Sequence, residues 1–405
     1  MLVMDENRHL GDSFLSHSPL GTTATNTELA TMIQRDRNHP SIIMWSLCNE
    51  EVLRGRPEGV RLFAAMTKVV HRYDGTRPIT CAINGNWLTN GIADEDLIGV
   101  NYHTRQYDNI HRASPHLPMF ASETANNKTT RGEYLDDRTN GWVSGFNLTD
   151  SAWQPVASRP FVARAYTWKG FDYRGEPNPY GWPDISNHTG FVDCCGFPKD
   201  KYYYLQSWWS DKPMVHLMPM TWNWPGQEGQ AIRVIAFSNA RQVEVFLNGR
   251  SLGVQTMPQD GHLEWQVPYA PGRLTAKGFT KGKLMATEQV ETTGTPALIQ
   301  LLPERQVLHA DGQDTLVVPV SILDAKGRLV PYAHNRVSFK LGGGGRILGV
   351  GNGNPSDHNP DRANQRNAFH GHCIVIIQAG SNPETLQLTA TSPGLSSANM
   401  TFRVR

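Results

Sequence analysis

The first half of this 405-residue chain alternates short apolar runs with stretches of helical periodicity, which is the pattern of β/α units. A helix is predicted from Val60 to His71, where apolar residues recur at helical spacing. The predicted strands are 2–5, 42–47, 78–83, 97–102, 118–121 and 165–171. This rhythm predicts a (β/α)8 barrel of the TIM type. Because a complete barrel has eight strands, we expect one that lacks its first strands.

The pattern changes after Trp209, where helical periodicity stops and β-forming segments follow one another. Asn248-Gly249 is the strongest hairpin signal, because a type I′ turn needs a positive φ at both central residues. A polar link near 293–296 separates two such β regions. The predicted domains are therefore a partial barrel at 1–208 and β-sandwiches at 209–294 and 295–405.

Composition limits the classes of partner. The 38 Lys and Arg residues balance 37 Asp and Glu residues, so the formal net charge is +1 and no basic field predicts binding to nucleic acid or to an anionic membrane. No apolar run reaches the length of about 20 residues that spans a bilayer. The five cysteines lack the paired spacing of a zinc site or a disulfide framework. A neutral sugar is compatible with these features.

Two segments each predict a buried strand that ends in a glutamate. In the first, Pro40 precedes an apolar run that stops at Asn49 and Glu50. In the second, Pro118 precedes another apolar run that ends at Glu123. Catalytic groups of barrels gather where the strands end. The alternative for a single glutamate is a surface residue after a core strand, since charged residues are mostly exposed.

A pair of strand-terminal glutamates suits hydrolysis of a glycosidic bond, in which one carboxyl group protonates the leaving oxygen. A separation of roughly 5–5.5 Å between the two carboxyl groups indicates retention of anomeric configuration, and roughly 6.5–9.5 Å indicates inversion. The sequence does not determine this separation.

Several motifs carry a resemblance to a known family. RDRNHPSIIMWSLCNE at 35–50 resembles the acid/base motif of glycoside hydrolase family 2, which includes β-galactosidases, β-glucuronidases and β-mannosidases. MDENRHLG at 4–11, GVNYH at 99–103, FASET at 120–124 and the segment 168–200 resemble its β-galactosidase-like branch. Segments 222–253 and 349–361 are similar to the C-terminal β domains of that branch, so the resemblance implies that both β-sandwiches are immunoglobulin-like. The resemblance identifies the chain as the C-terminal portion of such an enzyme.

The resemblance implies a role for seven residues. Glu50 would be the general acid/base and Glu123 the nucleophile. The residues implied in substrate binding are Asn49, Tyr102, His103, Trp168 and Glu6. Asn49 would bind the hydroxyl beside the anomeric carbon, Tyr102 would donate to the nucleophile, and Trp168 would form an aromatic wall. For each the alternative is a packing, capping or solvent-facing role.

The implied function is a retaining glycosidase that removes terminal β-linked sugars, with β-D-galactosides favoured. The alternatives are β-glucuronidase or β-mannosidase specificity and a noncatalytic carbohydrate-binding or scaffolding fragment. The implied partner is a β-linked oligosaccharide or glycoside, and oligomer formation is left open. No cofactor is predicted, and a divalent metal is not excluded. The resemblance suggests a periplasmic or extracellular location, although the first residues lack the pattern of a signal peptide.

Overall fold

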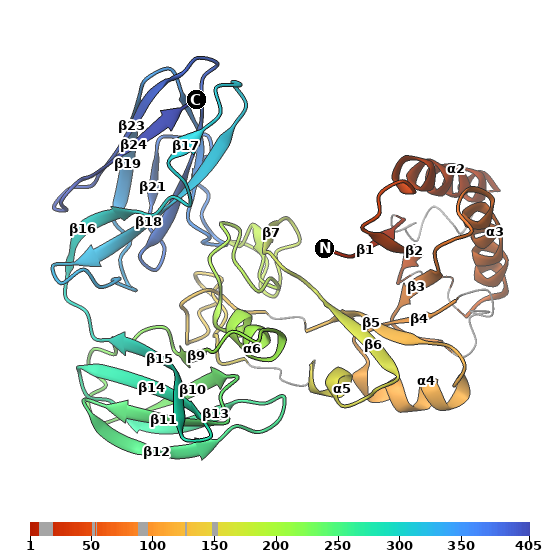
Figure 1. Ribbon diagram of the computed structural model, residues 1–405, viewed down its shortest axis with the longest axis horizontal. Helices are drawn as coiled ribbons and strands as arrows, with labels where there is room; N and C mark the ends of the chain where they lie inside the picture. The colour runs from red at the N-terminus through yellow and green to blue at the C-terminus, as the bar shows by residue number, and fades with distance from the viewer. Residues whose placement is uncertain (8–18, 51–52, 54, 88–95, 126–127, 148–152) are drawn as a thin grey trace. The chain divides into compact units, whose positions relative to one another are not determined.

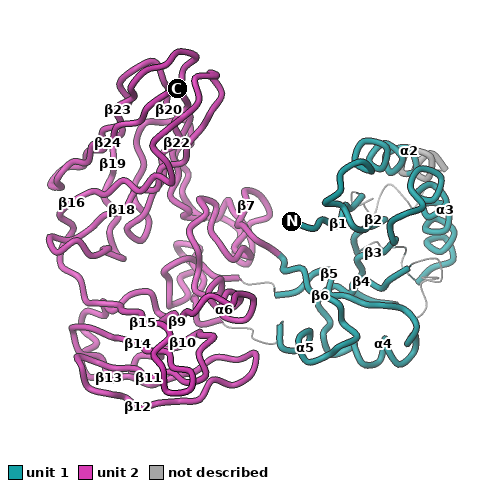
Figure 2. Tube along the Cα trace, viewed as in Figure 1, with its two compact units in different colours: residues 1–126, 149–168 teal, residues 127–148, 169–405 magenta. Residues whose placement is uncertain are grey.

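The chain forms two compact units in a computed structural model, shown as a ribbon in Figure 1 and coloured by unit in Figure 2. Unit 1 contains residues 1–126 and 149–168, and unit 2 contains residues 127–148 and 169–405. The residues that the structure describes are 1–7, 19–50, 53, 55–87, 96–125, 128–147 and 153–405, with the backbone alone for 19–25. Residues 8–11 of the MDENRHLG motif lie outside this set.

Unit 1 is built on one parallel sheet with the strand order β1-β2-β3-β4-β5-β6. The strands are β1 (Val3–Glu6), β2 (Ile42–Asn49), β3 (Ile79–Ile83), β4 (Ile98–Asn101), β5 (Met119–Thr124) and β6 (Val162–Thr167). Every residue of β3, β4 and β5 is buried. Burial on both faces is typical of parallel strands in an α/β fold and explains their nearly continuous apolar runs.

Helices connect these strands, as Figure 1 shows. They are α2 (Pro19–Asp36), α3 (Pro57–Tyr73), the short 3₁₀ helix η2 (Thr104–Gln106), α4 (Tyr107–Ala113) and α5 (Gln154–Ala157). Helix α3 begins with a proline in its first turn, where a missing N–H costs nothing. It buries Leu62, Phe63, Met66 and Val70, which lie on one face at helical spacing.

The predicted helix between the second and third strands is therefore confirmed, and the first five predicted strands lie within one to three residues of the observed ends. The sixth was placed too late: it was predicted at 165–171 and is observed at Val162–Thr167. Its body is polar and partly exposed, since Ala163 and Arg164 face solvent, so it lacks the apolar run by which the other strands were found.

Unit 2 contains two β-sandwiches, each closed around its own apolar core. The first pairs the sheet β13-β10-β9 with the sheet β12-β11-β14-β15, and the second pairs β16-β18-β22-β20 with β17-β24-β23-β19-β21. The strands of the first are β9 (Val215–Met218), β10 (Ala231–Ser238), β11 (Gln242–Leu247), β12 (Arg250–Thr256), β13 (Leu263–Pro268), β14 (Arg273–Thr280) and β15 (Lys283–Glu291). Those of the second are β16 (Pro296–Leu301), β17 (Val307–Leu308), β18 (Thr315–Asp324), β19 (Arg336–Gly342), β20 (Arg346–Gly351), β21 (Gln365–Asn367), β22 (His372–Gln378), β23 (Glu384–Thr391) and β24 (Ala398–Val404).

The predicted hairpin turn joins β11 to β12. Asn248 has a φ of 50° and Gly249 a φ of 83°, so both central residues are left-handed as the turn requires. This prediction is confirmed.

The remaining part of unit 2 contains little regular structure and is held by buried ion pairs. It includes β7 (Tyr173–Arg174), β8 (Ser186–Asn187) and α6 (Asp200–Trp209). Arg131 pairs with Asp193 at 2.6 Å, and Lys199 pairs with Asp172 at 2.8 Å. All four side chains are at most 5% exposed, so each charge is removed from water and depends on its partner for compensation.

The predicted boundaries at 208/209 and 294/295 stay a prediction. Among the described residues, no helix is both long and apolar enough to cross a membrane.

Candidate active site

Glu50 and Glu123 both lie at the carboxyl edge of the parallel sheet. Glu50 directly follows β2, and its backbone N–H donates to the carbonyl of Ala82 at 2.8 Å. Glu123 is the penultimate residue of β5 and is 9% exposed. Glu50 has a φ of 48°, a left-handed conformation that non-glycine residues adopt rarely and that recurs at turns and at functional sites. The fold thus brings the two predicted glutamates to the same edge of one sheet.

Asn101, the last residue of β4, links the two glutamates. Its amide nitrogen donates to Oε1 of Glu50 and to Oδ1 of Asn49, both at 3.0 Å. The same side chain lies close enough to Glu123 to lower the pKa of its carboxyl group. Its oxygen accepts from the Ser122 hydroxyl at 2.6 Å, which fixes the orientation of the amide. Asn101 is completely buried, so these contacts have no competition from water.

Tyr102 also contacts Glu123. The backbone N–H of Tyr102 donates to the carbonyl of Glu123 at 2.7 Å, and its hydroxyl is hydrogen-bonded to the Glu123 carboxylate. Burial, followed by the negative charge of Glu123, raises the pKa of Tyr102 well above its usual range, so the hydroxyl stays protonated. With a φ of 58°, Tyr102 is a second strand-end residue in the left-handed region. The hydroxyl is therefore a donor to the carboxylate at any physiological pH.

Burial raises the pKa of Glu123 to about 7. Hydrogen bonds from Tyr102 and Asn101 oppose this effect, whereas the negative charge of Glu50 adds to it. A nucleophilic carboxylate must be ionised. The shift of the Glu123 pKa therefore runs against the role implied for it, and the two donors act in the direction that the role needs.

The other predicted residues lie at the ends of neighbouring strands. Glu6 ends β1 and accepts a hydrogen bond of 2.7 Å from the Ser46 hydroxyl. His103 is exposed, and its ring meets that of Trp87 edge to face at a centroid distance of 5.4 Å. Trp168 follows β6 and is 37% exposed, so the core-packing alternative does not describe it.

Within the described part of the chain, no group of three or more His, Cys, Asp or Glu side chains is arranged to hold a metal ion. The five cysteines are free thiols, and Cys48, beside the site in sequence, is completely buried.

Three protein-family models match parts of this chain. The family model described as glycosyl hydrolases family 2, TIM barrel domain, matches residues 5–152, and glycoside hydrolase family 2 C-terminal domain 5 matches 299–401. Together these two models cover more than half of the chain. The chain belongs to glycoside hydrolase family 2. A domain of unknown function (DUF4982) matches residues 229–286 between them. The predicted family and the predicted fold, part of a TIM-type barrel followed by β domains, are confirmed.

Named relatives include two of the three specificities that the sequence left open. The chain is 37% identical to the β-galactosidase BoGH2A of Bacteroides ovatus, over 92% of this chain and 50% of that protein. It is 30% identical to a putative β-glucuronidase of Formosa agariphila, over 95% of this chain and 41% of that protein. The crystal structure of a β-glycosidase from Bacteroides vulgatus matches with a TM-score of 0.84 and 31% identity, over 93% of this chain and 53% of that one. The chain thus spans about half the length of the relatives it matches.

Sequence reasoning missed Asn101 and Ser122. Both lie in quoted motifs, GVNYH and FASET, and each is next to a residue that was singled out. Adjacency to a predicted site residue at a strand end was the available signal.

Proposed function

We propose that this chain carries the catalytic carboxylates of a retaining glycoside hydrolase that removes terminal β-linked sugars. Glu50 protonates the leaving oxygen as general acid, and Glu123 attacks the anomeric carbon to form a glycosyl-enzyme. Glu50 then acts as a base and activates the water that hydrolyses this intermediate. The observation that carries the proposal is the position of both carboxyl groups at the strand ends beside Asn101, which donates to Glu50 and lowers the pKa of Glu123.

The surroundings of Glu123 supply the remaining parts of this mechanism. Glu123 must lose its proton before it attacks, and the donors Tyr102 and Asn101 stabilise the ionised form. Because the pKa of Glu123 is about 7, glycosyl transfer to the enzyme should slow as the pH falls below this value. Asn49, held by Asn101, is placed to bind the hydroxyl beside the anomeric carbon. Trp168 offers an exposed aromatic face to the sugar ring.

For specificity, we propose β-D-galactosides first. The 37% identity to a β-galactosidase over 92% of the chain supports this choice. β-Glucuronides are the second candidate, because relatives at 30% and 24% identity carry β-glucuronidase names. β-Mannosidase specificity has no named support among these relatives. Parallel assays with aryl β-galactoside, β-glucuronide and β-mannoside rank the three directly.

The test is covalent trapping. The chain is incubated with a 2-deoxy-2-fluoro β-galactoside that has a good leaving group, alone and after mixing with the N-terminal half of the Bacteroides ovatus relative. Peptide mass spectrometry should find the fluorosugar on Glu123. Glu123→Gln should abolish labelling, whereas Glu50→Gln should still be labelled, because the activated leaving group needs no acid. Labelling of another residue would contradict the assigned roles.

The noncatalytic alternative predicts a different result from the same mixtures. A carbohydrate-binding or scaffolding fragment would bind glycosides without label and without turnover in every combination. Turnover that appears with the added half and disappears in Glu50→Gln would exclude this alternative.

A further inference from the structure

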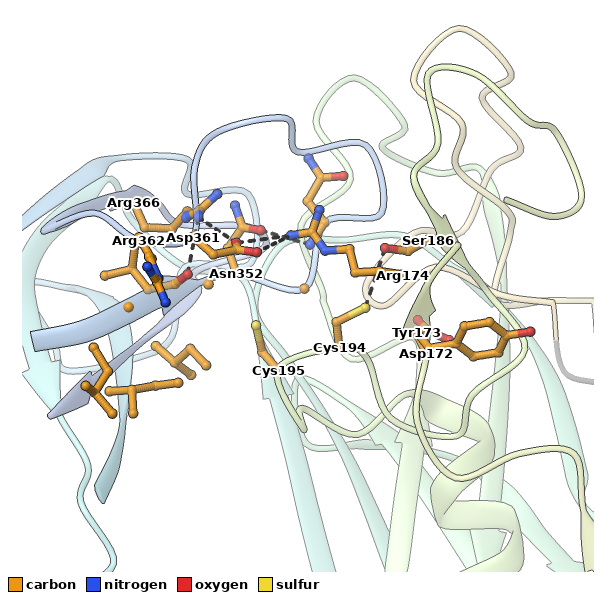
Figure 3. A pocket seen from close by; sticks show the side chains of 18 residues that line it. Asp172, Tyr173, Arg174, Ser186, Cys194, Cys195, Asn352, Asp361, Arg362 and Arg366 are labelled. Atoms are coloured by element: carbon orange, nitrogen blue, oxygen red, sulfur yellow. Dashed lines mark hydrogen bonds and ion pairs between the residues drawn. The ribbon is translucent and has the colours of Figure 1, made fainter. Parts of the chain in front are cut away.

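The second β-sandwich bears a cavity of about 500 Å³ on its outside, within unit 2 (Figure 3). The cavity is lined by β20, β22 and the loop 352–362 on one side, and by β7, β8 and Cys194–Cys195 on the other. Its volume falls in the range of roughly 300–1,000 Å³ that is typical of small-molecule sites. It is separate from the strand ends that carry Glu50 and Glu123, because all its lining residues belong to unit 2.

The floor of the cavity is an apolar surface where a solvated sheet would be polar. In β22, Cys373, Val375 and Ile377 point into the sandwich core, so Ile374 and Ile376 point outward. Both of these isoleucines line the cavity. An antiparallel sheet with one face in water normally alternates apolar and polar residues, and β22 does not. The outer face of β22 therefore has the apolar residues that are typical of a covered surface.

Arginines surround this floor. Arg174 and Arg366 both contact the carboxylate of Asp361, at 3.1 and 2.9 Å, as the dashed lines in Figure 3 mark. Arg362 also lines the cavity and is exposed. Among the described residues it makes no ion pair or hydrogen bond. Lys199 already neutralises the other acidic lining residue, Asp172.

The lining thus has an excess of positive charge. It contains three arginines and two aspartates. Lys199 pairs with Asp172, and Arg366 also pairs at 2.9 Å with Asp357, which lies outside the lining, so one positive charge remains. Arg366 is 1% exposed, and its Nε has no hydrogen-bond partner among the described residues. A single anionic group beside Arg362 would balance the charge. Guanidinium groups suit a carboxylate because they present paired donors in one plane.

The rest of the wall offers groups that fit hydroxyls. Ser186, Asn352 and Asn354 line the wall with polar side chains, and Asn352 also donates to Asp357 and to the carbonyl of Asn367. Gly351 and Gly353 allow this loop to pack closely against the other side. A Cβ at Gly351 would lie 2.8 Å from Sγ of Cys195, and one at Gly353 would lie 1.9 Å from the Asp193 carboxylate. An apolar floor, several hydroxyl partners and one cationic side match a pyranose ring that carries a carboxylate.

We propose that this cavity binds a uronic acid, at a site distinct from the catalytic carboxylates. The C–H face of the ring packs on Ile374 and Ile376, and the carboxylate pairs with Arg362. The site does not depend on the proposed hydrolase activity. It would let the protein hold an acidic glycan independently of any bond that it cleaves.

The two isoleucines allow a direct test. The full chain is labelled with ¹³C-methyl isoleucine and titrated with glucuronate, with galactose and with sodium sulfate at equal ionic strength. We expect the methyl signals of Ile374 and Ile376 to shift with glucuronate, at an affinity at least about tenfold above that for galactose. The additional charge-assisted hydrogen bonds are the cause of this preference. Mutants Ile374→Val and Ile376→Val assign the two signals.

Two variants of matched chemistry decide the role of the arginine. Arg362→Gln should weaken glucuronate binding about tenfold or more, and Arg362→Lys should retain part of it. Arg403→Gln, on an exposed position of β24 in the same sandwich, should have no effect. Glu123→Gln should leave the two methyl shifts unchanged, which separates this site from the catalytic one. Equal shifts with galactose, equal shifts with sulfate alone, or undiminished binding by Arg362→Gln would each overturn the proposal.

Discussion

The clearest electrostatic prediction concerns the proton on Glu123. Its pKa is raised from an ordinary 4.5 to about 7, first by burial and also by the charge of Glu50. Glu50→Gln removes that charge and keeps the size of the side chain. We therefore expect the pKa of Glu123 to fall in this variant, and to stay above 4.5 because burial, the largest cause, remains.

The magnitude follows from linkage. Between pH 4.5 and about 7 the folded protein keeps a proton on Glu123 that the unfolded chain has lost. The free energy of unfolding therefore falls as the pH rises through this interval. At about 1.4 kcal/mol per pH unit, the upper limit of the loss is about 3 kcal/mol, and residual solvent screening reduces it. Glu50→Gln should recover part of this loss above pH 7 and none of it below pH 4.

The assay is a ¹³C NMR titration of side-chain-labelled glutamate in the full chain, from pH 4 to 9. The Glu123→Gln spectrum identifies the resonance. Glu58→Gln is the matched control, because it makes the same chemical change on the exposed surface of α3. The reasoning is refuted if Glu123 titrates at an unchanged or higher pH in Glu50→Gln, or if Glu58→Gln lowers its midpoint equally.

Three further perturbations test other parts of the structure. Arg131→Met should lower the free energy of unfolding by about 3–5 kcal/mol in urea titrations, because it leaves the carboxylate of Asp193 buried without its cation; Arg131→Lys should lose less. Gly353→Ala should destabilise by about 1–3 kcal/mol, since its Cβ would lie 1.9 Å from the Asp193 carboxylate. Gly327→Ala, which has the same φ of 76° and open space around it, should cost less in the same thermal melts. Asn101→Leu removes an amide donor beside Glu50 and Glu123, so the same NMR titration should report a higher pKa for Glu123, and an unchanged midpoint would contradict an effect of Asn101 on this carboxyl group.

The parts of the fold that could be predicted are those with a strong local pattern. Strands β2 to β5 are predicted by their apolar runs, and α3 is predicted by the spacing of its apolar residues, because burial restricts the residue types at these positions. The turn at Asn248-Gly249 could be predicted because few residues adopt its backbone angles. Strand β6 was misplaced because five of its six residues are not buried, so burial does not restrict its residue types to an apolar run.

The loops of unit 2 could not be predicted, for a different reason. Their cohesion depends on ion pairs between residues far apart in the chain, such as Arg131 with Asp193, which are 62 positions apart. Arg131 also donates to the carbonyl of Asn352, 221 positions away. The sequence near each of these residues does not identify its partner. A charged side chain is therefore predicted to face solvent unless the structure shows the residue that it pairs with.

The position of Asn101 beside Glu50 and Glu123 could not be predicted from the sequence either. Strict pairing of β4 with β5 continues from Val100 opposite Ala121 and would place Asn101 opposite Ser122. The register instead shifts by one residue, so that Asn101 lies opposite Glu123. An irregularity of this kind redirects a side chain, and such features recur beside active sites. The rule that catalytic groups end strands finds the two glutamates one at a time. Asn101 lies beside both of them only because of the register between the strands, and the two-residue alternation of a strand sequence does not determine that register.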